Sequence, residues 1–120
     1  MSGQIHIQGE FIIKKGKSGE FKKLIKKMSK SVQINEPDTL HYHFYLDEND
    51  SRCIVYEKYT DSKATLAHHN GIASQTILPQ IFKISKLNRL EVYGKPSKEL
   101  KKLLGTFDAK IYRFVTGFAR

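Results

Sequence analysis

The chain has 120 residues, 39% of them hydrophobic, which is enough for one compact domain and too few for two. Its single cysteine, Cys53, excludes an internal disulfide and a zinc site built from several thiolates, and it favours a reducing compartment. The longest apolar runs span only a few residues, and residues 1–4 lack the basic and apolar pattern of a signal peptide. We therefore expect a soluble, cytoplasmic protein without a membrane partner.

The net charge of +9 raises the question of a nucleic-acid partner, because a basic surface attracts polyanions. The charge comes from 17 lysines and only four arginines, however, whereas base readout and phosphate clamps favour the planar arginine fork. Lysines spread along a helix usually form a solvated face. The composition therefore argues against nucleic-acid binding.

The first predicted element is a strand over residues 4–13, where apolar and polar residues alternate with a period of two. After a glycine-containing turn, the apolar spacing becomes helical from Glu20 to Val32, with five lysines on the remaining faces. The apolar side of this helix carries Phe21, Leu24, Ile25, Met28 and Val32. Met28 lies on the apolar side, and we interpret it as core filler. Pro37 restricts the residue before it and ends this helix.

A hairpin comes next, with strands over 39–46 and 52–59 joined by a polar loop. Asp61 is suited to cap a short helix over 62–69. Asn70-Gly71 is expected to end that helix by supplying a left-handed residue.

The last predicted elements are a helix over 74–86 kinked at Pro79, a strand over 88–94, a helix over 97–104 and a strand over 110–116. The order is βαββαβ with an extra C-terminal helix and strand. It predicts an α+β, ferredoxin-like fold with the helices on one face of an antiparallel sheet. We divide the chain into a domain of residues 1–104 and a C-terminal strand or dimer arm of residues 105–120.

The other face of such a sheet must meet water or a second molecule. By strand parity, this face is expected to carry Tyr45, Val55, Cys53 and Ile12 beside histidines. A face of such mixed character suggests a homodimer that encloses a cavity.

A symmetric hairpin loop over 47–51 would place His41 opposite Glu57, His43 opposite Val55 and Tyr45 opposite Cys53 on that face. Tyr42, Phe44, Ile54 and Tyr56 would then face the helices. A carboxylate beside an imidazole raises its basicity, so Glu57 with a neighbouring histidine is a candidate general base. The alternative is a structural pair that stabilises the strands or the dimer interface. A slip of one residue would scramble the assignment.

The remaining histidines are weaker candidates. His68 and His69 end the predicted short helix, where an imidazole is commonly just a partner for the helix dipole. His6 would join the polar face or lie exposed at its edge. The histidine spacings do not match a zincin, and no phosphate-binding glycine loop is present. We therefore expect no metal and no cofactor.

Two segments carry a family resemblance: Glu-Pro-Asp-Thr-Leu-His-Tyr at 36–42, and residues 55–68. In the second, Glu57, Tyr59 and His68 fit the spacing Glu-x-(Trp or Tyr)-x-Asp-x-x-Ala-x-x-x-His without gaps. This pattern resembles the antibiotic biosynthesis monooxygenase (ABM) family over residues 4–95.

The resemblance implies a dimeric α+β barrel in which each subunit holds a pocket between its sheet and helices. It also implies oxygenation of aromatic quinols or polyketides without metal or flavin, because the deprotonated substrate itself gives an electron to dioxygen. Some relatives cleave haem with the help of an indole, but this chain has no tryptophan, so that activity is not expected.

The expected function is that of a cofactor-independent monooxygenase acting on a small aromatic or quinol-type substrate. The catalytic candidates are His41, His43, Glu57 and His68, and the substrate-binding candidates are Tyr45, Tyr59, His6 and Asn70. The alternative is a non-catalytic dimeric barrel of stress-response type that binds a small hydrophobic ligand. Nucleic-acid binding through the lysine-rich helix ranks third, and steep salt dependence would reveal it.

Overall fold

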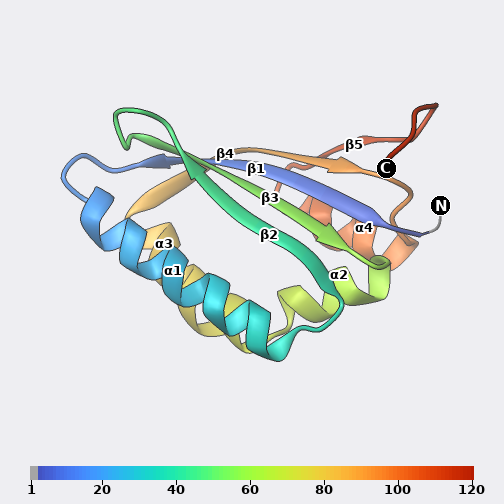
Figure 1. Cartoon of the computed structure of the whole chain (residues 1–120), viewed down its shortest axis with the longest axis horizontal. Helices are drawn as coiled ribbons and strands as arrows, with labels where there is room; N and C mark the ends of the chain where they lie inside the picture. The colour runs from blue at the N-terminus through green and yellow to red at the C-terminus, as the bar shows by residue number, and fades with distance from the viewer. Residues whose placement is uncertain (1–2) are drawn as a thin grey trace.

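The computed structural model describes residues 3–120, in which five strands form one sheet (Figure 1). The strands are β1 (Ile5–Ile13), β2 (Thr39–Leu46), β3 (Arg52–Tyr59), β4 (Ser85–Tyr93) and β5 (Lys110–Tyr112). Their order across the sheet is β2-β3-β1-β4-β5. The first four strands pair antiparallel, and β5 is parallel to β4.

The helical segments of the described chain cover one face of this sheet (Figure 1). They are α1 (Ser18–Asn35), α2 (Ser62–His69), the π-helical turn η1 (Ala73–Ile77), α3 (Leu78–Lys83) and α4 (Lys98–Gly105). The arrangement confirms the predicted α+β, ferredoxin-like fold with an extra C-terminal helix and strand. Within residues 3–120, no helix has the length and apolar character needed to cross a bilayer.

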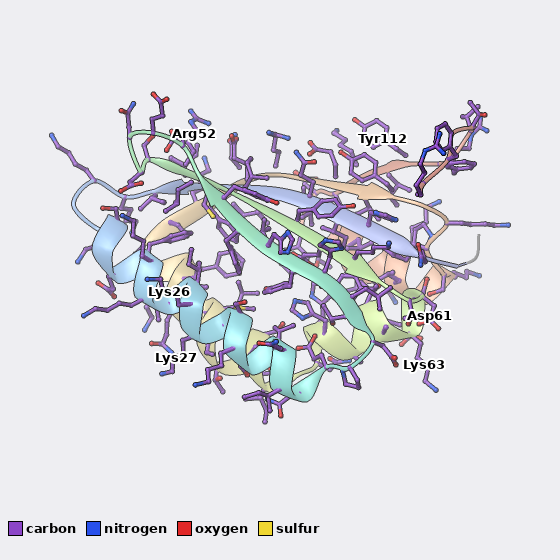
Figure 2. The ribbon with its side chains drawn as sticks, viewed as in Figure 1. Lys26, Lys27, Arg52, Asp61, Lys63 and Tyr112 are labelled. Atoms are coloured by element: carbon purple, nitrogen blue, oxygen red, sulfur yellow. The ribbon has the colours of Figure 1, made fainter. Side chains whose placement is uncertain are left out.

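The periodic segments adopt the structure that their patterns predict. Strand β1 alternates between buried and half-buried residues along its whole length. Helix α1 buries Phe21, Leu24, Ile25, Met28 and Val32, the same set that the helical spacing selected. Figure 2 shows Lys26 and Lys27 on α1, and both are exposed.

The hairpin register is one residue away from the prediction. Leu46 pairs with Cys53, Phe44 with Val55 and Tyr42 with Glu57. Because side chains alternate along a strand, this shift exchanges the two faces of β3. The buried residues of β3 are Cys53, Val55, Glu57 and Tyr59, while Ile54 and Tyr56 are on the face away from the helices. The expected placement of Cys53 and Val55 on the open face was therefore wrong.

The loop between β2 and β3 explains the shift. The Asp47 carboxylate accepts hydrogen bonds from the backbone N–H groups of Ser51 (2.8 Å) and Arg52 (3.0 Å). Asp50 takes a left-handed conformation, with φ of 54°. This asymmetric turn sets Cys53, rather than Arg52, opposite Leu46.

The predicted cap of α2 is confirmed, because the Asp61 carboxylate accepts a hydrogen bond from the N–H of Ala64 at 2.8 Å. The predicted left-handed stop after α2 was wrong. Asn70 is right-handed, with φ of −93°, and the Gln75 N–H donates to the carbonyl of Gly71. The chain therefore coils on into η1, and Pro79 falls in the first turn of α3, where no amide hydrogen is needed.

Helix α4 packs on the same sheet face as the other helices, and β5 extends the sheet beside β4. Ser97 caps α4, whose Leu100 and Leu104 are fully buried. Strand β5 ends at Tyr112, four residues short of the predicted end at Thr116.

Two clusters of buried side chains fill the space between the sheet and the helices. One is centred on α1, and it includes Phe11, Met28, Val55 and Ile81. The other is centred on α4, and it includes Ile7, Tyr59, Leu90 and Leu104. The packing leaves a cavity where the two clusters meet.

Candidate functional site

The cavity lies between the sheet and the helices, and its volume is about 60 Å³. Its lining comprises Ile7, Phe11, Met28, Tyr42, Phe44, Val55, Glu57, His68, His69, Leu78, Ile81, Phe82, Leu87, Leu90 and Phe107. Most of these side chains are apolar, and Glu57 is the carboxylate among them. The cavity is thus formed within one chain, not between the open faces of two sheets as strand parity had suggested.

Glu57 extends from β3 toward the helices and is buried. The Tyr59 hydroxyl, two residues along the same strand, donates a short hydrogen bond to Glu57 Oε1. Burial raises the pKa of Glu57 above its ordinary value, although the charge of His68 and the Tyr59 hydrogen bond oppose this shift. Burial also raises the pKa of Tyr59 well above 10, so its phenol stays protonated and remains a donor.

His68 reaches the same space from α2 and is also buried. Its Nδ1 lies 2.8 Å from Glu36 Oε1, which also accepts a hydrogen bond from the Thr39 hydroxyl at 2.9 Å. Burial alone would lower the pKa of His68, but the hydrogen bond to Glu36 and the charge of Glu57 outweigh it and raise the pKa. The site therefore favours an imidazolium at His68, between two carboxylates.

His69, the next residue along α2, has the opposite character. Burial and the neighbouring charge of His68 lower its pKa to about 4, so it is neutral at pH 7. Its ring lies 5.7 Å from that of Phe107, measured between centroids. His69 therefore lies between the charged residues of the cavity and its apolar wall.

The structure brings together Glu57, Tyr59 and His68 of the predicted site residues. It separates the others from them. His41, His43 and Tyr45 are exposed on the open face of β2, and Asn70 is exposed after α2. The expected pairing of His41 or His43 with Glu57 was wrong, because the register shift puts Tyr42 opposite Glu57 instead.

His6 also lies on the open face, where its Nδ1 is 2.7 Å from the Tyr56 hydroxyl. The rings of His41 and His43 are 4.6 Å apart on the same face. Tyr112 of β5 stacks on Tyr93 at 5.7 Å, on the side of the sheet away from the helices (Figure 2). Within residues 3–120, no three His, Cys, Asp or Glu side chains are arranged to hold a metal ion.

Sequence reasoning missed four residues of the site: Glu36, Tyr42, His69 and Phe107. Glu36 stands in the first family-like segment, so that segment was the available signal for it. Tyr42 was correctly placed facing the helices, but without its pairing to Glu57 it was not connected to the site. No sequence signal points to Phe107, which lies 38 positions beyond His69.

Comparison with known proteins adds to this geometry. A family model described as antibiotic biosynthesis monooxygenase matches residues 4–78, which is more than half of the chain. The chain belongs to this family. The predicted family resemblance is therefore confirmed, and the motif residues Glu57, Tyr59 and His68 lie within the matched region.

Solved structures share the ABM fold. MupZ from Pseudomonas fluorescens has a TM-score of 0.83 at 22% identity, over 98% of this chain and 94% of MupZ. A variant of SnoaB, a cofactor-independent oxygenase from Streptomyces nogalater, has a TM-score of 0.68 at 10% identity, over 81% of this chain and 97% of SnoaB. A conserved protein from Methanosarcina mazei Go1 scores 0.67 at 19% identity, over 77% of this chain and 92% of its own. No curated protein matches the sequence.

Proposed function

We propose that this ABM protein is a cofactor-independent monooxygenase that acts on a small aromatic or quinol-type substrate. One observation carries the proposal: a buried carboxyl group with a raised pKa, Glu57, stands at the wall of an otherwise apolar cavity. A carboxylate with a raised pKa is a stronger base than usual, and an apolar pocket fits an aromatic ring. The family membership and the likeness to an oxygenase support the same reaction class.

The reaction needs one base, one acidic substrate and dioxygen. For an anthrone-type substrate, the carboxylate of Glu57 takes a proton from the ring methylene and leaves a carbanion. The carbanion gives one electron to dioxygen, and the resulting carbon radical and superoxide combine to form a C–O bond. Return of the proton gives a hydroperoxide, which loses water to leave a ketone. One oxygen atom enters the product and the other leaves as water.

The other polar residues prepare this step. Tyr59 holds the Glu57 carboxylate in place by its hydrogen bond. His68, with its raised pKa, supplies positive charge that stabilises the substrate anion, and Glu36 keeps the imidazole oriented. The apolar walls shelter the anion and the radical from water.

We also propose that two copies pair through the open faces of their sheets. The exposed Tyr45 and the rings of His41, His43 and Tyr56 would lie in that interface. A sheet face that no helix covers and that exposes aromatic rings is a candidate contact surface for a second copy.

Oxygen uptake with a panel of hydroquinones and anthrones tests the function. We expect turnover by the wild type and a loss of at least about 100-fold in Glu57→Gln, because general base catalysis contributes about 10²–10⁴-fold. Glu48→Gln, the same change at an exposed loop residue, is the matched control and should keep wild-type rates.

A second variant distinguishes the Glu57 site from the histidines on the open face of the sheet. His43→Gln should retain turnover, because His43 lies across the sheet from the cavity. If His43→Gln is inactive and Glu57→Gln is active, the assignment of the base is wrong. Tight binding of these compounds without oxygen uptake would instead identify a non-catalytic ligand-binding barrel.

A further inference from the structure

A second hollow lies directly outside the cavity. It is an open cleft of about 560 Å³ lined by Phe82, by residues 85–89 and by residues 106–108. It is bounded by the end of α3, the first half of β4 and the turn between α4 and β5. The cleft is far larger than the cavity of about 60 Å³ and carries polar side chains such as Asn88 and Thr106.

Three apolar side chains line both spaces: Phe82, Leu87 and Phe107. They form the partition between the inner cavity and the outer cleft. Phe82 is 37% exposed, and Leu87 and Phe107 are half-buried, so all three also meet solvent. A partition of side chains at the surface can open by rotamer changes, which occur in picoseconds to nanoseconds for exposed residues.

The backbone around this partition is irregular. A β-bulge interrupts the pairing of β1 with β4 next to Phe11, which is paired with Leu87. Strand β5 pairs only with residues 91–93 of β4, so it does not reach Leu87. Phe107 stands in a tight turn before Asp108, whose φ is 59°. Bulges of this kind are common beside active sites, where they re-aim a side chain.

We infer that Phe107, with Phe82 and Leu87, is a gate between the outer cleft and the cavity, and that Phe107 limits the size of substrate that reaches Glu57. The route and the size limit concern binding alone, and only the reaction that follows rests on the proposed function. An apolar cavity of about 150 Å³ takes up benzene, so a cavity of about 60 Å³ has to open at the partition before an aromatic ring can enter. The substrate class that fits is an aromatic ring carrying a polar extension, with the ring in the opened cavity and the extension among the polar side chains of the cleft.

The probes for this inference are 1-naphthol and 2-anthrol, which have two and three fused rings. Association rates are measured by stopped-flow fluorescence of the probe, with affinity from titration. We expect Phe107→Ala to speed association of 1-naphthol about 10-fold and to speed association of the larger 2-anthrol by more. We expect Phe107→Trp to slow association of 1-naphthol. Phe118→Ala is the matched control, because Phe118 is 82% exposed near the end of the same segment, and it should stay within twofold of wild type.

Phe82→Ala opens the gate from the α3 side and provides a second test if Phe107→Ala does not fold. The inference is overturned if a folded Phe107→Ala or Phe82→Ala protein shows unchanged rates and the same size limit, or if no variant binds either probe. Altered probe binding without oxygen uptake by any variant would support the gate and refute the proposed function. Failure of the gate and failure of the proposed monooxygenase function therefore give different results.

Discussion

Two adjacent histidines of α2 show how local surroundings decide protonation. His68 and His69 are both largely removed from water, and burial alone lowers the pKa of each. His68 gains a carboxylate partner in Glu36 and has its pKa raised, whereas His69 has its pKa lowered to about 4. The partner, rather than the position on the helix, therefore determines the charge.

His69 makes the folded protein less stable in acid. Its pKa falls from 6.5 in the unfolded chain to about 4 in the folded one, so the unfolded state binds more protons between these values. Stability is full above pH 6.5 and declines as the pH falls, by about 2 kcal/mol at pH 5 from this residue. Urea unfolding at pH 7.5 and pH 5 should show a smaller decline in His69→Gln than in wild type. An equal decline in His69→Gln and wild type would contradict the assignment.

The Glu36 carboxylate is expected to hold up the pKa of His68. In Glu36→Gln the negative charge disappears while burial remains, so the pKa of His68 should fall. NMR titration of the imidazole ring protons measures this directly. Asp38→Asn removes a nearby exposed carboxylate and should leave the pKa of His68 unchanged. A His68 pKa that is the same in Glu36→Gln and wild type would show that Glu57 alone sets it.

At the scale of elements, the sequence predicted those features of helices and strands that depend on neighbouring residues in the chain. The buried residues of α1 follow from helical spacing, and the Asp61 cap follows from the chemistry of one side chain. The hairpin register did not follow, because it depends on the Asp47 hydrogen bonds and the left-handed Asp50 in the loop. A shift of one residue then moved Glu57 to the opposite face from that expected.

The candidate site likewise contains residues that the sequence predicted and residues that it did not. The family spacing selected Glu57 and His68, which the fold brings to one end of the cavity. Glu36 meets His68 across 32 positions, and Phe107 meets His69 across 38, so both contacts depend on how whole elements pack. No local pattern in a single sequence encodes such contacts.

Gly94 connects β4 to the C-terminal segment, and its backbone requires glycine. Its φ is 133°, and a Cβ at this position would lie 2.7 Å from the carbonyl oxygen of Gln4. We expect Gly94→Ala to lower the free energy of unfolding by about 1–3 kcal/mol, measured by urea denaturation. Gly105→Ala is the matched control, because a Cβ there meets open space at the end of α4, and it should be neutral or slightly stabilising. Equal stabilities of the two variants would contradict this reasoning.

At the scale of the molecule, the two sheet faces differ in what they leave unburied. The helices cover one face, while the other presents rings from β1, β2, β3 and β4. The exposed Tyr45 is at the β2 edge of this face. Histidines and Lys58 lie beside these rings, and the pKa of His6 is lowered by burial, by Lys58 and by His41.

The proposed pairing of two copies through this face predicts a concentration-dependent dimer. Light scattering after gel filtration at pH 7.5 should give twice the chain mass of 13.8 kDa for wild type. Tyr45→Asp should give the monomer mass, because it places an unpaired charge in the interface. Ile34→Asp makes a similar change at a residue 69% exposed on α1, away from the sheet, and should remain dimeric. A wild type that stays monomeric at 100 µM would rule out the dimer. A Tyr45→Asp variant that is as dimeric as Ile34→Asp would place the contact on another surface.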